Sequence, residues 1–162
     1  AEGDLGPAAN DVTGLIGQYA HGDEPSHHVA DLYNYIGRQH KCAEKVRYIL
    51  NELYFDDYSG VCGNEDAGQM SAWYVLSSLG LYQVDPAKGD FQFGSPAVRK
   101  AVVKVGEGKT FTVIAENNSP ENIYIQSAKL NGVKLDRTSI TYDEIMAGGT
   151  LEFVMGPQPA DE

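Results

Sequence analysis

The stretch Ala67–Leu79, which reads AGQMSAWYVLSSL, decides how the first half of this 162-residue chain folds. Its apolar residues, from Met70 onward, cover most of the circumference of a helix. We therefore expect a helix over residues 67–79 that is buried nearly all round and that ends at Gly80 in a left-handed conformation. A helix of this kind needs apolar neighbours on every side, which suggests that the chain is part of a larger fold.

Two further helices are predicted upstream of this stretch. Apolar residues recur there at the spacing i, i+3, i+4 and i+7, which places them on one helical face. The first set is Val29, Leu32, Tyr33 and Ile36, and the second is Val46, Ile49, Leu50 and Leu53. We expect each helix to bury that face.

The period changes near residue 88, where helical spacing gives way to the alternation typical of strands. The expected strands are Ala101–Val105, Phe111–Ala115, Ile123–Leu130 and Leu151–Met155. Gly106-Glu107-Gly108 and Asn131-Gly132 have the composition of hairpin turns, the second of type I′. Thr141 followed by Glu144 is typical of a capping box that opens a short helix.

These patterns predict an α+β protein made of two regions. Residues 1–88 are expected to form a helical segment, and residues 89–162 an antiparallel, β-sandwich-like sheet.

The composition of the chain excludes some functions but identifies none. A net charge of −11 without basic runs disfavours a nucleic-acid partner, and no apolar run has the length of a membrane helix. Cys42 and Cys62 are too few for a disulfide framework. We expect reduced, structural thiols, and a single bridge between the two is the alternative.

The segment His21–His28, HGDEPSHH, concentrates carboxylates and imidazoles just ahead of a helix. One interpretation is a simple helix start, with Pro25 in the first turn and acidic residues favoured by the helix dipole. A zinc site is the weaker alternative, because adjacent His27 and His28 face different directions on a helix. The oxygens of Asp23 and Glu24 suit a hard cation such as calcium better.

The segment Gly63–Trp73, GNEDAGQMSAW, combines polar residues with the start of an apolar helix. Asp66 followed by Gln69 has the spacing of a capping box, so a purely structural role is one interpretation. That role leaves Asn64 and Glu65 unexplained. A carboxylate held rigidly at a helix start can also accept a proton from water, which makes Asp66 a candidate general base.

At these two segments the sequence resembles glycoside hydrolase family 92. The resemblance covers residues 14–28 and 63–75 and continues through Gly94-Ser95-Pro96, Ile125–Gly132 and Gly148–Gly156, in order and at family spacing. It implies an exo-acting α-mannosidase that inverts the anomeric centre, requires calcium and contains an (α/α)6 catalytic barrel beside β-sandwich material. The helical segment here would be an incomplete part of that barrel, and a periplasmic or secreted location follows from the same resemblance.

The resemblance also assigns roles to residues. Asp66 matches the general base, with Glu65 and Asn64 helping to hold the water. Asp23 and Glu24 fall in the segment associated with calcium and the terminal mannose, where Asp23 replaces the family's usual Asn. Glu24, His21, His27 and His28 are the expected contacts to the sugar.

The family's general acid lies in an upstream motif of the type Glu-Gly-Asn-x-Trp-x-Tyr, which does not occur here. We therefore expect the partners to be a mannose-containing glycan and the missing N-terminal part of the same enzyme, and we expect the fragment alone to be inactive. Two alternatives stay open: a non-catalytic carbohydrate-binding or structural module, and another (α/α)6 enzyme such as a phosphorylase, for which no phosphate cradle is visible.

Overall fold

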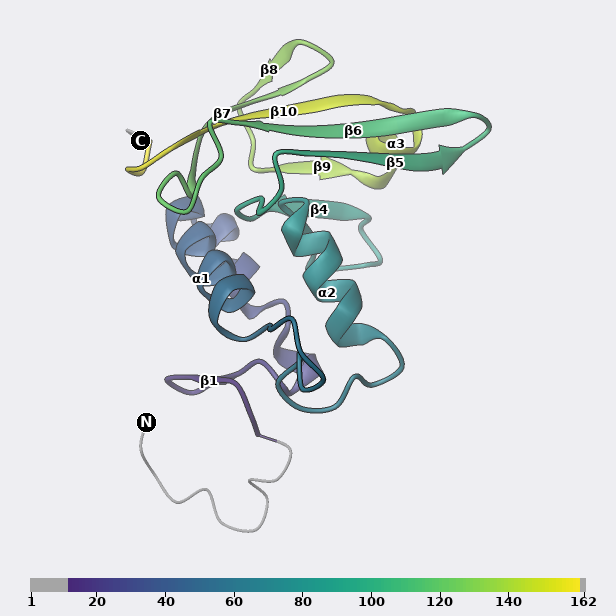
Figure 1. Ribbon diagram of the computed structural model, residues 1–162. Helices are drawn as coiled ribbons and strands as arrows, with labels where there is room; N and C mark the ends of the chain where they lie inside the picture. The colour runs from purple at the N-terminus through teal and green to yellow at the C-terminus, as the bar shows by residue number, and fades with distance from the viewer. Residues whose placement is uncertain (1–11, 161–162) are drawn as a thin grey trace.

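The computed structural model describes residues 12–160 (Figure 1). Helices occur in its first half, where the apolar residues have helical spacing. A short hairpin and a single 3-10 turn come first, followed by three longer helices. In chain order these elements are β1 (Leu15–Ile16), β2 (Tyr19–Ala20), η2 (Glu24–Ser26), η3 (Val29–Ile36), α1 (Gln39–Glu52) and α2 (Gln69–Ser78). The predicted positions of all three helices are confirmed, and α1 buries Val46, Ile49 and Leu50 as expected.

The predicted buried face of η3 is wrong. η3 is a 3-10 helix that buries Ala30, Asp31 and Asn34. Because a 3-10 helix has three residues per turn, side chains at i and i+3 eclipse one another. Val29 and Leu32 are therefore aligned on the outer side, where they are 40% and 42% exposed.

The helix α2 ends as predicted, at Gly80 with φ +82°, but it is not buried all round. Met70 and Trp73 are fully buried, whereas Tyr74 and Val75 are 41% and 57% exposed. The buried side faces the elements that this chain supplies, α1 and the strand that follows α2. The opposite side is covered only in part, by the loop between α1 and α2, where Tyr54 lies 4.7 Å from Tyr74 between ring centroids.

The alternating half forms a five-stranded sheet with the order β5-β6-β10-β7-β8. Its strands are β5 (Lys100–Gly106), β6 (Lys109–Glu116), β7 (Tyr124–Leu130), β8 (Val133–Leu135) and β10 (Gly149–Gly156). The four predicted strands are confirmed, but the expectation of a purely antiparallel sheet is wrong. β10 pairs in parallel with β6 and antiparallel with β7, because the chain returns to the middle of the sheet after three intervening strands.

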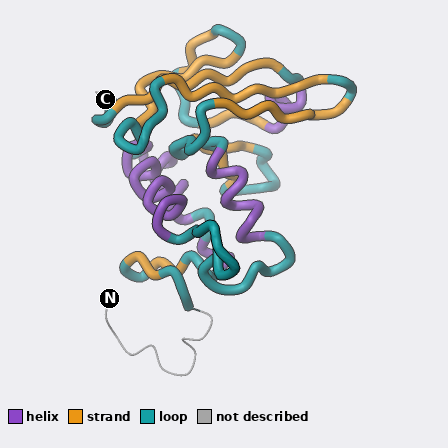
Figure 2. The backbone as a smooth tube through the Cα atoms, viewed as in Figure 1, coloured by secondary structure: helices purple, strands orange, loops and turns teal. Residues whose placement is uncertain are grey.

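A smaller sheet, β3-β4-β9, lies between the five-stranded sheet and the helices (Figures 1 and 2). Its strands are β3 (Leu81–Gln83), β4 (Asp90–Phe93) and β9 (Ser139–Thr141), so strand structure begins before residue 88. The inner faces of the two sheets share one core, in which Phe93 meets Phe153 edge-on at 5.0 Å between ring centroids. A second apolar cluster, built around Val46, Ile49 and Trp73, holds the helices together.

Both predicted hairpin turns are confirmed by their backbone angles. Asn131 and Gly132 have φ +50° and +80° between β7 and β8, as a type I′ turn requires. Glu107 has φ +50° between β5 and β6.

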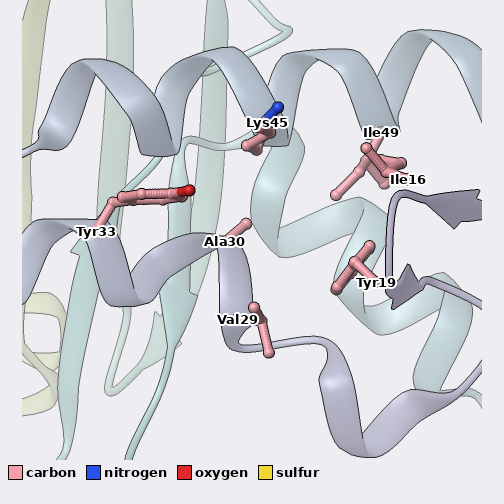
Figure 3. Close-up of a pocket in the computed structure, with 7 residues that line it drawn as sticks. All are labelled: Ile16, Tyr19, Val29, Ala30, Tyr33, Lys45 and Ile49. Atoms are coloured by element: carbon pink, nitrogen blue, oxygen red, sulfur yellow. The ribbon is translucent and has the colours of Figure 1, made fainter. Parts of the chain in front are cut away.

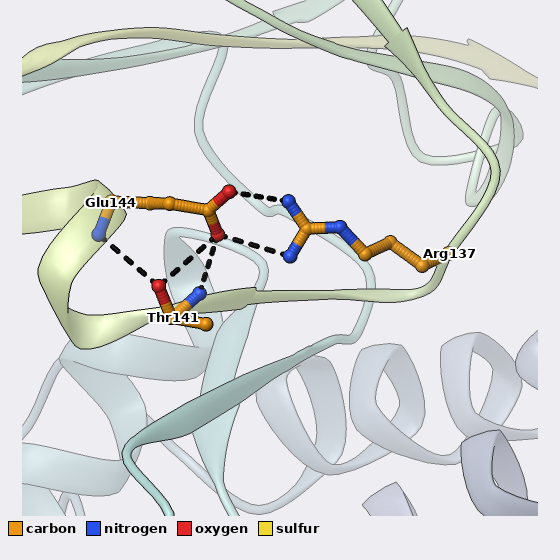
Figure 4. Close-up of polar contacts among 3 residues, drawn as sticks. All are labelled: Arg137, Thr141 and Glu144. Atoms are coloured by element: carbon orange, nitrogen blue, oxygen red, sulfur yellow. Dashed lines mark hydrogen bonds and ion pairs between the residues drawn. The ribbon is translucent and has the colours of Figure 1, made fainter.

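The predicted capping box opens the short helix α3 (Tyr142–Met146), as Figure 4 shows. Thr141 Oγ1 accepts a hydrogen bond from the Glu144 amide at 3.2 Å, and Glu144 Oε2 accepts one from the Thr141 amide at 2.8 Å. Arg137 adds a two-pronged contact to the same carboxylate. Chiefly through this Arg137 contact, the pKa of Glu144 is lowered from 4.5 to about 2.

Two substitutions of Glu144 separate the contribution of the capping box to stability from that of the charge pair with Arg137. Glu144→Ala is expected to lower the free energy of unfolding by about 1 kcal/mol, and Glu144→Gln by less, because glutamine can still accept from Thr141. Since the folded pKa lies below the unfolded one, the charge contributes above pH 4.5 and its contribution is lost as the pH falls toward 2. In urea denaturation, the difference between wild type and Glu144→Gln should shrink from pH 7 to about pH 3. An unchanged difference would contradict the Arg137 pairing.

Candidate active site

The first acidic segment forms a tight turn between β2 and η3. Asp23 precedes η2, and Pro25 occupies the first turn of η2 as predicted. The Ser26 hydroxyl lies 2.6 Å from the Ala20 carbonyl and 2.7 Å from the Asp23 carbonyl, both of which can accept its hydrogen bond. This turn leaves Asp23 exposed and Glu24 half-buried at the surface.

The second segment carries an unusual backbone just before α2. Asp66, Ala67 and Gly68 have φ values of +46°, +58° and +97°, so three consecutive residues lie in the left-handed region. Only the glycine adopts this conformation without steric cost, and strain of this kind at non-glycine residues is concentrated at functional sites. The backbone therefore marks Asp66 independently of any sequence motif.

The predicted capping box of Asp66 and Gln69 is wrong. Gly68 stands at the N-cap of α2, and no side chain bonds from that position. Instead, Glu65 Oε1 accepts a hydrogen bond from the Ser71 amide at 3.1 Å. Glu65 thus takes the capping role, which leaves the exposed carboxylate of Asp66 free of that structural duty.

The two acidic segments meet at Glu24 and Asp66. The backbone amide of Glu24 lowers the pKa of its carboxyl, but the hydrogen-bonding contact with the Asp66 carboxyl, partial burial and the charges of Asp66 and Asp23 outweigh it and raise the pKa. Oε1 of Glu24 is buried and receives no hydrogen bond from a protein donor. Glu24 and Asp66 therefore form a carboxylate pair whose negative charge is not compensated by a nearby cation among the described residues.

The contact between Glu24 and Asp66 limits what the pair can do. In an inverting glycosidase the acid and the base lie roughly 6.5–9.5 Å apart, so that the sugar and a water fit between them. Two carboxyls in hydrogen-bonding contact are too close for these roles. This contact favours a general acid that lies elsewhere over Glu24 as the partner of Asp66.

A network of rings and polar groups lies beneath the pair and joins the two segments. His21 and His27 stack with their ring centroids 4.5 Å apart, and both are fully buried. Trp73 lies edge-on to His21 at 4.4 Å and donates its indole N–H to the His27 carbonyl at 3.1 Å. Trp73 of α2 therefore contacts the first acidic segment directly, through His21 and His27.

The hydrogen bonds fix the tautomer of each histidine. The Tyr54 hydroxyl donates to the Met70 carbonyl, so it accepts from His21 Nε2 at 2.7 Å, and His21 Nδ1 accepts from Tyr19 at 2.7 Å. His27 Nε2 donates to the His21 carbonyl at 2.8 Å. Burial, with a smaller contribution from His27, lowers the pKa of His21 from 6.5 to about 3, and burial lowers the pKa of His27 as well. Both rings are neutral at ordinary pH.

Gln69 completes this network from the start of α2. Its amide nitrogen donates to His27 Nδ1 at 3.0 Å and to the Tyr82 hydroxyl at 3.0 Å. The sequence explains Gln69 equally well as part of a helix cap, and it gives no local signal for Tyr54 or Tyr82. Only the folded chain shows that Gln69 and Tyr54 bind the two buried histidines of the first acidic segment and that Tyr82 binds Gln69.

The structure therefore divides the predicted site residues into two groups. Asp23, Asn64, Glu65 and Asp66 are exposed, while Glu24 and His28 are half-buried. His21 and His27, expected as sugar contacts, have exposures of 0% and 1%, and protein groups occupy all their ring nitrogens. Their place in the structure is that of supports beneath the surface.

The donor set fits part of a calcium shell. Ca²⁺ binds carboxylate oxygens. Asp23 and Glu24 supply adjacent carboxylates, and Oε1 of Glu24 is buried and without a hydrogen-bond partner among the residues that the structure describes. Within residues 12–160, however, no three His, Cys, Asp or Glu side chains gather in a group that could hold a metal ion. Since Ca²⁺ takes 6–8 oxygens, the remaining ligands would have to come from water, substrate or other protein segments.

Comparison with known proteins identifies the family. The chain matches the model of the glycosyl hydrolase family 92 catalytic domain over residues 3–157, and it belongs to that family. A family GH92 α-mannosidase from Bacteroides thetaiotaomicron, solved in complex with mannoimidazole, is 42% identical, with a TM-score of 0.90 over 93% of this chain and 20% of that chain.

Two other relatives are similar to this chain. A family GH92 inverting mannosidase from Bacteroides thetaiotaomicron VPI-5482 is 42% identical, with a TM-score of 0.82 over 88% of this chain and 19% of that chain. An uncharacterized secreted glycosidase from Arthroderma benhamiae is 34% identical over 85% of this chain and 18% of its own length. The chain thus spans about a fifth of the length of these relatives. In the described region, no helix is long and apolar enough to cross a membrane.

Proposed function

We propose that this chain is the base-bearing part of a calcium-dependent, inverting exo-α-mannosidase that releases terminal α-linked mannose from glycans. The strained backbone at Asp66 carries the proposal, because it holds an exposed carboxylate just before the start of α2 in a chain of this family. In this function Asp66 accepts a proton from the attacking water. Asn64 and Glu65 border that position, and Glu24 and His28 contact the sugar.

The acid of the reaction comes from outside the chain in this proposal. Glu24 is too close to Asp66 to protonate a leaving group on the opposite face of the sugar. The relatives are about five times longer than the region matched here, which leaves room for an acid on another segment. The helices of this chain would then be one portion of an (α/α)6 barrel.

Asp23 and Glu24 would hold the calcium ion together with oxygens from elsewhere. When bound, the ion supplies positive charge that orients vicinal sugar hydroxyls. It would also compensate the charge of the Glu24 and Asp66 pair. The secreted glycosidase among the relatives supports a secreted location, and a periplasmic location is the alternative.

Proton NMR of α-mannobiose hydrolysis tests the function. The natural full-length polypeptide should release β-mannose first, and a chelator should stop the reaction until calcium is restored. The 162-residue chain alone should show no turnover, because it lacks an acid. Release of α-mannose first would contradict inversion, and turnover by the isolated chain would contradict the division of acid and base between segments.

A further inference from the structure

Asp31 is a buried carboxyl group that the candidate active site does not use. It lies on the inner face of η3 with an exposure of 0%. Its backbone amide donates to the His28 carbonyl at 3.1 Å, which ties it to the end of the first acidic segment. The Cys42 thiol of α1 donates to Asp31 Oδ1 across 3.6 Å. The other carboxyl oxygen, Oδ2, has no hydrogen-bond partner within the described residues.

Asn34 has the matching deficiency one turn further along η3. Its amide nitrogen donates to the Phe93 carbonyl at 2.9 Å, but Oδ1 of the same side chain is buried without a partner in the described region. Because side chains at i and i+3 of a 3-10 helix eclipse one another, Asp31 and Asn34 are neighbours on the inner face. Two acceptor oxygens can bond to one another only through a proton, which a protonated carboxyl supplies.

The groups that face Asp31 in the described part of the chain are weak acids and carbonyls, and none of them is a cation. Burial, and after it the charge of Asp31, raises the pKa values of Cys42 in α1 and Tyr19 in β2. Tyr82 in β3 is close enough for the same charge to add to the effect of burial on its pKa. From β4, the Phe93 carbonyl also accepts from the Cys42 thiol. An ionised Asp31 would therefore be an uncompensated buried charge.

Neither a lysine nor the neighbouring pocket relieves this burial. Lys45 of α1 is exposed and lines an apolar pocket of about 150 Å³ between η3 and α1 (Figure 3). The other residues that line the pocket are Ile16, Tyr19, Val29, Ala30, Tyr33 and Ile49, so the pocket does not open onto Asp31. Burial raises the pKa of Asp31 from 3.8 to about 7, and the Cys42 thiol and the Asp31 backbone amide, which lower it, do not offset this effect.

We propose that Asp31 is held as a neutral carboxylic acid whose Oδ2–H donates to Asn34 Oδ1, and that loss of this proton loosens η3 together with the first acidic segment. Ionisation leaves a charged oxygen beside an unpaired amide oxygen in the interior, which is unfavourable. His28 is both the N-cap of η3 and the last residue of the acidic segment, so a change in η3 reaches the turn that carries Glu24. The proposal does not depend on the reaction that the protein catalyses.

Asp31→Asn in the natural full-length polypeptide tests the shared proton, because asparagine imitates the protonated acid. Its oxygen can accept from Cys42, and its nitrogen can donate to Asn34 Oδ1 at every pH. Since the pKa of Asp31 is raised on folding, the wild-type carboxyl contributes most to stability below about pH 4, and this contribution is lost as the pH rises to 7. At a fixed calcium concentration, Asp31→Asn should raise Tm by about 3 °C or more at pH 8 and by at most about half as much at pH 5.

Asp136→Asn is the matched control, since it makes the same exchange at an exposed carboxylate in the loop after β8. It should change Tm by less than about 1 °C at both pH values. A Tm difference between Asp31→Asn and wild type that is equal at pH 5 and pH 8 would overturn the proposal. A lower Tm for Asp31→Asn at pH 8 would also overturn it, because the wild-type carboxyl would then be stable as an ion.

Hydrogen exchange followed by mass spectrometry locates the effect in the same two proteins. At pH 8, peptides from residues 21–36 should exchange faster in wild type than in Asp31→Asn. Peptides from β6 and β10 should not differ, because these strands lie in the other core. Equal exchange over residues 21–36 would show that the proton does not control the acidic segment and would overturn that part of the proposal.

Discussion

Asp66→Asn in the natural full-length polypeptide is expected to lower kcat for an α-mannoside by about 10²–10⁴-fold, the usual contribution of a general base. Asparagine keeps the size and the left-handed tolerance of aspartate, so the strained turn should persist. KM should change little, because Asp66 acts on the water and the other site residues still hold the sugar. Steady-state kinetics with a chromogenic α-mannoside and a calcium titration would measure both constants.

Glu65→Gln is the companion variant that distinguishes the two adjacent carboxylates as candidates for the base. The amide oxygen of the substituted side chain could still accept the hydrogen bond that Glu65 receives from the Ser71 amide, so the start of α2 should be preserved. If Glu65→Gln abolishes turnover and Asp66→Asn does not, the base is Glu65. If neither changes kcat, the acidic turn serves only the fold and the assignment of the site fails.

Trp73→Ala is expected to have the largest effect on stability, lowering the free energy of unfolding by about 3–5 kcal/mol. Trp73 is fully buried, and its ring lies 4.4 Å from His21, 5.9 Å from Tyr54 and 6.2 Å from Tyr82 between centroids. Alanine would leave a cavity at the centre of the helical cluster and would remove the donor to the His27 carbonyl. Urea denaturation followed by far-UV circular dichroism would measure the loss.

Two companion variants locate the cause of this loss. Trp73→Phe keeps a ring but removes the N–H, so it should cost about 1–3 kcal/mol. Tyr48→Ala removes an aromatic ring that is 49% exposed on α1, and it should change stability by less than about 1 kcal/mol. A Trp73→Ala cost as small as that of Tyr48→Ala would show that the cluster does not hold the helices together.

Periodicity and turn chemistry predict most of the secondary structure because both are local. The helix α1, the strands of the large sheet and the turn at Asn131-Gly132 all follow from spacing within a few residues. The parallel pairing of β6 with β10 could not be predicted, because it joins segments about 40 residues apart with no local signal. The burial of Asp31 and Asn34 in η3 could not be predicted, because the formation of a 3-10 helix there depends on packing against α1 and β4.

The site was predictable as two acidic segments but not as an arrangement. Sequence motifs point to Glu24 and Asp66, and only the fold brings them into contact. Gln69 has a plausible local role in a cap, yet its side chain turns inward to His27 and Tyr82. Glu65 takes the capping role because positive φ at residues 66–68 turns the chain before α2 begins.

The position of β10 also determines when the five-stranded sheet can form during synthesis of the chain. β10 (Gly149–Gly156) is the last strand within residues 12–160 and the middle one of the five-stranded sheet. Until a ribosome has released it, the β5–β6 and β7–β8 hairpins have no strand to join them. A chain truncated near residue 148 would lose β10 and would therefore keep two unconnected hairpins with exposed edges, which are open to pairing with other chains.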